Sequence, residues 1–112
     1  MADHITLRPA AGRFVVKAGE TILGTTDHAV ELREGGHGPV LYVPRADVDM
    51  SLLERTDRAT TCPWKGMASY YSVKAPSGKL DNAVWTYETP KAGLAGIAGH
   101  LAFYPSVRVT PE

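Results

Sequence analysis

A thiol, an indole and an ammonium group stand close together in residues 60–66, which read T-T-C-P-W-K-G. A neighbouring cation favours the thiolate form of cysteine, and the thiolate is the nucleophile in cysteine chemistry. Cys62 near Lys65 is therefore a candidate nucleophile. The alternative interpretation is structural: Cys62 is a small buried apolar side chain and Trp64 anchors a core, because free cysteines are usually buried.

A nucleophilic cysteine needs a base, and histidine is the side chain that titrates near neutral pH. His28 and His100 could reach a pocket, whereas His37 sits in a glycine-rich turn and His4 lies in an N-terminal stretch that we expect to be frayed. None of these spacings proves a partnership with the thiol, and a structural role for each histidine is the alternative. The candidate catalytic residues are Cys62, Lys65 and His100.

The aromatic residues are too numerous for a core of this size to hide without polar partners for their hydroxyl and indole groups. Some of them should line a groove, with a few charged side chains that orient a ligand. The alternative is that the rings fill the sheet interior and only their polar tips reach the rim. The predicted ligand-binding residues are Arg33, Glu34, Tyr42, Trp64, Lys65, Tyr70, Trp85 and Tyr87.

Other site chemistries lack their sequence patterns. The chain has no H-x-x-x-H, no C-x-x-C and no Asp-rich calcium loop, so we predict no dedicated metal site. The glycine-rich residues 35–38 lack the Gly-Lys-Ser pattern of a phosphate-binding loop and predict a hairpin turn instead. We predict no cofactor.

Length and charge limit the partners. With 112 residues the chain is expected to form one domain over residues 1–112. Twelve Lys and Arg balance twelve Asp and Glu, so no net field attracts nucleic acid or an anionic membrane, and neither is predicted as a partner. A protein with little net charge near its pI tends to self-associate, which makes a homodimer an alternative to a small-molecule partner.

Cysteine use and hydropathy favour a cytoplasmic location. Cys62 is the one cysteine, so an intrachain disulfide cannot form, and a reducing compartment fits. Residues 1–13 do not resemble a secretory signal. The most apolar stretch, residues 92–104, is interrupted by glycine and is too short to span a bilayer.

The spacing of apolar residues and turn signals predicts a mainly β fold with one or two short helices. Residues 13–25 should form a hairpin, and residues 29–34 and 40–43 a second one. A short helix is expected near residues 45–49, extended chain at 50–56, and a turn at 76–78. Further strands are expected at residues 67–73, 80–87, 101–104 and 107–109, with a short helix or a loop at 92–99. We expect residues 1–12 to be frayed.

Five segments also carry a family pattern. They are residues 32–34, residues 40–48, residues 62–71, residues 82–87 with Pro90, and residues 97–104. The most specific run is C-P-W-K-G-x-A-x-Y-Y followed by N-A-x-W-x-Y. On these motifs the chain resembles domain-of-unknown-function family 427 over nearly its whole length.

The resemblance implies a compact, two-sheet domain of tent-like or barrel-like shape. The family sometimes carries a nucleotidyltransferase-like label, but the sequence shows neither a Gly-Ser pair followed by paired aspartates nor another carboxylate arrangement for two-metal chemistry. If the family pattern marks a site, the positions carried over, without roles, are Arg33, Glu34, Tyr42, Cys62, Trp64, Lys65, Tyr70, Trp85, Tyr87 and His100.

The leading hypothesis is a binding module whose aromatic-lined pocket holds a small planar or anionic metabolite, oriented by Lys65 and Arg33. One alternative is an enzyme in which Cys62 attacks an electrophilic substrate, helped by Lys65 and His100. The other alternative is a structural or homodimerising interaction domain. The sequence alone does not decide whether the protein is an enzyme.

Overall fold

The computed structural model describes residues 4–76 and 78–112, which form ten strands and three single turns of 3-10 helix. The strands are β1 (Ile5–Pro9), β2 (Phe14–Ala18), β3 (Thr21–Thr26), β4 (Val30–Glu34), β5 (Val40–Tyr42), β6 (Leu53–Cys62), β7 (Gly66–Ala75), β8 (Gly78–Thr86), β9 (Leu101–Phe103) and β10 (Arg108–Pro111). The helical turns are η1 (Arg45–Asp47), η2 (Met50–Leu52) and η3 (Ala95–Ile97).

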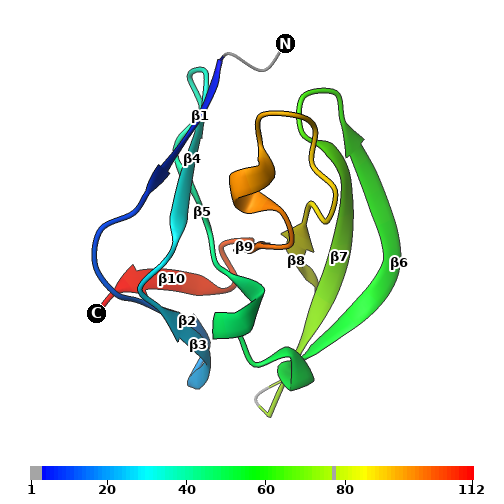
Figure 1. The fold of residues 1–112 in the computed structure, drawn as a ribbon. Coiled ribbons are helices and arrows are strands. Elements are labelled where there is room, and N and C mark those ends of the chain that lie inside the picture. The colour runs from blue at the N-terminus through cyan, green and yellow to red at the C-terminus, as the bar shows by residue number, and fades with distance from the viewer. Residues whose placement is uncertain (1–3, 77) are drawn as a thin grey trace.

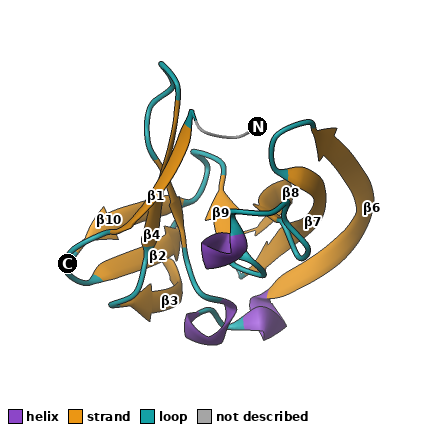
Figure 2. Cartoon of the chain, turned by 45° about the horizontal axis from the view of Figure 1, so that its top comes forward, coloured by secondary structure: helices purple, strands orange, loops and turns teal. Residues whose placement is uncertain are grey.

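The described strands pair into three antiparallel sheets, in the orders β1-β4-β5, β10-β2-β3 and β6-β7-β8-β9. Figure 1 shows the first and third sheets standing on either side of η3, with the β10-β2-β3 sheet at the lower left, beneath the first sheet. One helical turn, η3, lies in the middle of the molecule, and the other two lie along its lower edge (Figure 2).

The register of β7 and β8 decides which side chains share a face of the largest sheet. Tyr70 lies opposite Trp85, and Tyr71 lies opposite Val84. Because directly opposed residues point to the same side and successive residues alternate, Tyr70 and Trp85 share one face while Tyr71 points to the other. This alternation separates the two sets of functional groups described below.

The interior divides into two groups of buried side chains. The aliphatic core joins the β10-β2-β3 sheet to the lower part of the β6–β9 sheet, and its fully buried members are Val16, Leu23, Val43, Val73, Val84 and Leu101. The aromatic cluster joins the β1-β4-β5 sheet to the other face of the β6–β9 sheet. Its main members are Leu32, Tyr42, Tyr70, Tyr87, Leu94 and Ile97, with Cys62 and Trp85 packed against it.

A close backbone contact ties β3 to the segment after β5. Gly24 forms an isolated β-bridge with Val48, and the amide of Asp49 donates a hydrogen bond of 2.7 Å to the carbonyl of Leu23. A Cβ on Gly24 would lie 2.1 Å from the carbonyl oxygen of Asp47. Glycine is therefore required here by the close approach of the two backbones.

The mainly β class and both predicted N-terminal hairpins are confirmed, and the strands divide into three sheets where two were expected. The expected fraying of residues 1–12 is wrong for Ile5–Pro9, which pair with β4 along their whole length; residues 1–3 lie outside the described residues. Met50–Leu52 form a helical turn rather than extended chain. The predicted turn at 76–78 includes Ser77, which also lies outside the described part.

Nothing among the described helical turns approaches the length and apolar character that a membrane-crossing helix needs.

Candidate functional site

A buried ion pair joins two sheets at the edge of the aromatic cluster. Lys65 lies in the turn between β6 and β7, and Glu34 is the last residue of β4. The Lys65 ammonium donates a hydrogen bond of 2.5 Å to Glu34 Oε1, and the lysine side chain is only 11% exposed. This hydrogen bond holds the pKa of the Glu34 carboxyl below its usual value, even though burial opposes the shift. The predicted site residues Lys65 and Glu34 are thus brought together.

Trp64 lies outside this cluster. Its side chain is largely exposed, and its ring packs edge-on against His4 at a centroid distance of 4.9 Å. His4 Nε2 in turn lies 3.6 Å from Glu34 Oε2. Trp64 therefore approaches the ion pair only through His4 and is not a member of the buried cluster.

Two buried phenols lie beside the ion pair. Burial raises the pKa of Tyr42 to about 12, and the negative charges of Glu34 and of an ionised Cys62 add to the shift. Burial likewise raises the pKa of Tyr87, over whose ring the Lys65 ammonium lies 6.0 Å from the centroid. Both hydroxyls are neutral at physiological pH, so they act as hydrogen-bonding groups and not as bases.

The candidate catalytic residues are not assembled into a reactive group. Cys62 is half-buried against the aromatic cluster. Within residues 4–76 and 78–112, no hydrogen bond joins its sulfur to Lys65 or His100, whose Nδ1 lies 3.2 Å from the carbonyl oxygen of Ala98. The Lys65 ammonium is held by Glu34 instead. The geometry gives the thiol apolar and phenolic neighbours rather than a base.

Arg33 is not brought together with Glu34 and the buried phenols. Adjacent residues of a strand point to opposite faces, so Arg33 and Glu34 cannot both face the cluster. Glu34 points inward, whereas Arg33 is exposed and donates a hydrogen bond of 3.0 Å to Glu31. The remaining predicted residue, Tyr70, is buried in the cluster, and its hydroxyl lies 2.8 Å from Thr60 Oγ1.

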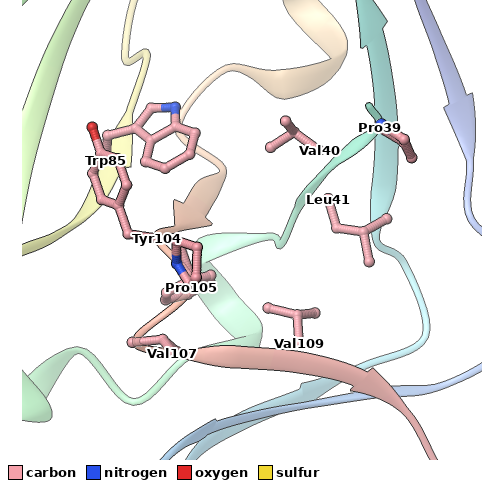
Figure 3. Close-up of a pocket in the computed structure, with 9 residues that line it drawn as sticks. Pro39, Val40, Leu41, Trp85, Tyr104, Pro105, Val107 and Val109 are labelled. Carbon is pink, nitrogen blue, oxygen red and sulfur yellow. The ribbon is translucent and has the colours of Figure 1, made fainter. Parts of the chain in front are cut away.

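An apolar pocket of about 380 Å³ opens beside Trp85 (Figure 3). The lining residues are Pro39, Val40, Leu41, Trp85, Phe103, Tyr104, Pro105, Val107 and Val109. Trp85 and Tyr104 pack together at a centroid distance of 4.7 Å and form its aromatic wall. The indole N–H of Trp85 donates a hydrogen bond of 3.2 Å to the Tyr42 hydroxyl, which links the pocket wall to the ion-pair region.

Trp85 was predicted as a ligand-binding residue, and Phe103 and Tyr104 belong to the aromatic residues of which some were expected to line a groove. The other pocket residues were missed from the sequence. They come from β5, β10 and the connections around them, so no local run of residues displays the pocket. The one available signal was the F-Y-P run at residues 103–105, where a proline directly follows two aromatic residues at the end of a strand.

The side chains that could hold a metal are scattered in the part of the chain that the structure describes. No three His, Cys, Asp or Glu side chains gather there in the manner of a metal site.

A comparison of the sequence with protein families decides the relationship that the motifs indicated. The family described as a domain of unknown function (DUF427) matches residues 6–111. The chain belongs to the DUF427 family. Its short label refers to nucleotidyl transfer, while its description names no activity. No curated protein matches this chain.

The DUF427 match spans every strand of the fold, from β1 to β10, and so includes the ion pair, the thiol and the Trp85 pocket. The described site of this DUF427 domain offers neutral phenols, a neutralised ion pair and an aromatic-walled hollow. Aromatic walls with a few polar groups are typical of small-molecule pockets in proteins.

Proposed function

We propose that this DUF427 domain is a binding module for a small, planar, uncharged molecule that occupies the pocket beside Trp85. The observation that carries the proposal is the composition of the pocket, because its nine lining residues include two packed aromatic rings and no charged side chain. A volume of about 380 Å³ falls in the range of ligand-binding clefts.

The aromatic wall supports binding because it is already ordered. The Trp85 indole is held on one side by the Tyr42 hydroxyl and on another by the Tyr104 ring. A side chain that is fixed before binding loses little conformational entropy when a ligand arrives. The binding of a planar molecule against the indole therefore costs little conformational entropy of the Trp85 side chain.

The preference for an uncharged ligand follows from desolvation. A charged group in an apolar hollow loses its hydration without gaining a partner. Lys65, which the sequence offered as an anion-orienting group, is hydrogen-bonded to Glu34, and Arg33 points away from the site. We therefore narrow the sequence-based hypothesis of a planar or anionic metabolite to a planar, uncharged one.

A matched pair of fluorescent probes tests this proposal. N-phenyl-1-naphthylamine is uncharged, and 1-anilinonaphthalene-8-sulfonate carries the same rings with one sulfonate. We expect the uncharged probe to bind saturably and at least tenfold more tightly, since tenfold corresponds to about 1.4 kcal/mol. Equal binding of both probes, or binding of the sulfonate alone, contradicts the proposal.

Two phenylalanine substitutions locate the binding. Val109→Phe adds a ring to a residue that lines the pocket and should abolish probe binding by filling the hollow. Met67→Phe adds the same ring at an exposed position on β7 and should leave binding unchanged. A loss of binding in both variants, or in neither, would show that the probe binds elsewhere.

We also propose that this DUF427 domain functions in the cytoplasm. The support is the free thiol of Cys62, which suits a reducing compartment.

A further inference from the structure

A second polar cluster lies on the β6–β9 sheet, on the face opposite Trp85. Ser69 and Tyr71 point to that face from β7, because Tyr70 between them shares the other face with Trp85. Arg55 comes from β6, Arg45 from η1, and Glu88 follows the end of β8. Segments far apart in the sequence thus converge here, and the hydrogen bonds among them define the cluster.

Arg55 and Glu88 form the centre of the cluster. Both terminal nitrogens of Arg55 donate hydrogen bonds of 3.1 Å to the Glu88 carboxylate. Arg55 Nη2 also donates a 2.9 Å hydrogen bond to Ser69 Oγ. The Arg55 hydrogen bonds hold the pKa of Glu88 below its usual value, so the carboxylate is ionised at neutral pH.

Arg45 is only partly satisfied by the same carboxylate. Its Nη2 donates a hydrogen bond of 3.1 Å to the Tyr71 hydroxyl but lies 3.6 Å from Glu88 Oε2, beyond good hydrogen-bonding distance. Both guanidinium groups also lie over the Tyr71 ring, at 5.5 Å and 6.0 Å from its centroid. Two cations therefore share one carboxylate, which leaves the cluster with an excess positive charge.

We propose that this cluster of Arg45, Arg55, Tyr71 and Ser69 binds a phosphoryl group, and that Glu88 occupies the position of that group when it is absent. A carboxylate has two oxygens, and those of Glu88 serve Arg55 while leaving Arg45 at longer range. A phosphoryl group offers three acceptor oxygens and a charge near −2, which would match two guanidinium groups once Glu88 has turned aside.

A buried hydroxyl on the same face supports the proposal. Thr86 lies directly opposite Ser69 in the β7–β8 register, so its side chain shares the face of the cluster. Among the described residues, Thr86 Oγ1 is the buried side-chain oxygen without a hydrogen-bond partner. Buried polar atoms are nearly always paired in native proteins, so the protein alone leaves this face incompletely satisfied.

The cluster is accessible from solvent, with the side chains of Arg45 and Arg55 38% and 52% exposed. It shares no residue with the Trp85 pocket. The phosphoryl site therefore stands independently of the proposed function, and the failure of one leaves the other intact.

The test is an NMR titration of the isotopically labelled protein, which follows the Nε–H signals of the arginine side chains. Inorganic phosphate is added at constant ionic strength, and acetate serves as the carboxylate comparison. We expect the Arg45 and Arg55 signals to shift saturably with phosphate and about tenfold more weakly with acetate, because the second guanidinium adds charge-assisted hydrogen bonds. No saturable shift, or equal affinity for acetate, overturns the proposal.

Two substitutions with opposite expected effects on phosphate affinity sharpen the test. Arg55→Gln should weaken phosphate binding about tenfold, and Glu88→Gln should strengthen it by a similar factor because the competing carboxylate is gone. Arg108→Gln, which removes the same charge from an exposed position on β10, is the matched control and should change nothing. Unchanged or weaker binding in Glu88→Gln contradicts the proposal even if Arg55→Gln fails to fold.

Discussion

The aliphatic core and the aromatic cluster are built from different chemistry within one small fold. Val16, Leu23 and Leu101 in the aliphatic core carry no side-chain polar atoms and are fully buried. Tyr42 and Tyr87 in the aromatic cluster are buried tyrosines with raised pKa values and lie beside an ion pair. The first region joins the β10-β2-β3 and β6–β9 sheets mainly by apolar burial, whereas the second also buries polar groups, which costs stability.

The comparison teaches that purely apolar packing and buried polar groups are concentrated in different parts of the interior. The β6–β9 sheet belongs to both regions, because Val84 faces the aliphatic core while the neighbouring Trp85 packs against the aromatic cluster. Substitutions in the aliphatic core should therefore cause the largest losses in the free energy of unfolding, and substitutions in the aromatic cluster should cause smaller losses that depend on pH. Five predictions test this division.

The largest loss of stability is expected in the aliphatic core. Leu101→Ala removes a fully buried side chain from the contact between β9 and the rest of the core. The resulting cavity should lower the free energy of unfolding by about 2 to 5 kcal/mol, measured by urea denaturation. A loss below 1 kcal/mol would mean that this region does not hold the sheets together.

The second-largest loss of stability is expected when the ion pair between Lys65 and Glu34 is broken. Glu34→Gln leaves the buried Lys65 ammonium without its carboxylate and should cost about 2 kcal/mol, less than for a fully buried pair because this one lies at the edge of the cluster. The double variant with Lys65→Met should recover part of that loss. Additive losses in the double variant would argue that the two side chains are not coupled.

The same pair predicts an acid dependence with a definite sign. The pKa of Glu34 is lowered in the folded protein, so its contribution to stability is complete above the usual pKa of 4.5 and is lost as the pH falls through the lower folded value. The difference in unfolding free energy between wild type and Glu34→Gln should therefore shrink below pH 4.5. A difference that stays constant down to pH 2 would contradict the assigned pairing.

A smaller effect is expected for Tyr42→Phe, which leaves the Trp85 indole N–H without its acceptor. The loss should be about 1 kcal/mol at pH 7. Because burial raises the folded pKa of Tyr42 from 10.0 to about 12, the wild type should also lose stability as the pH rises through that interval, and the variant should lose less. Denaturation at pH 7 and pH 11 would separate the two effects, and identical alkaline losses would refute the raised pKa.

The smallest effect is expected for Thr86→Val, which replaces an unpaired buried hydroxyl by a methyl group of similar shape. We expect a gain of up to about 1 kcal/mol in the free energy of unfolding, because no hydrogen bond is lost and a desolvated polar atom is removed. A clear loss of stability in thermal denaturation would mean that this hydroxyl is paired in solution.

Sequence patterns predicted the hairpins well because their alternation and glycine turns are local signals. The strand Ile5–Pro9 was missed although its residues alternate, because its partner Val30–Glu34 lies far along the chain. The strand Leu53–Cys62 was only partly expected, since it is an edge strand with mostly exposed polar residues and shows no apolar period.

The candidate site was predicted as residue types but not as contacts. Lys65 and Glu34 were both chosen, yet nothing in the sequence showed that they pair with each other across 31 positions. Arg33 was chosen beside Glu34 although strand alternation separates them. The Trp85 pocket arises where strands of all three sheets meet, so it becomes visible only in three dimensions.

The central claim is that a planar, uncharged molecule binds against Trp85, and the two indole N–H signals of the protein test it most directly. Trp85 lines the pocket with its N–H bonded to Tyr42, whereas Trp64 lies exposed beside His4. In an NMR titration with N-phenyl-1-naphthylamine we predict that the Trp85 indole signal shifts saturably while the Trp64 signal stays in place. A shift of the Trp64 signal alone, or no shift of either, would contradict the claim.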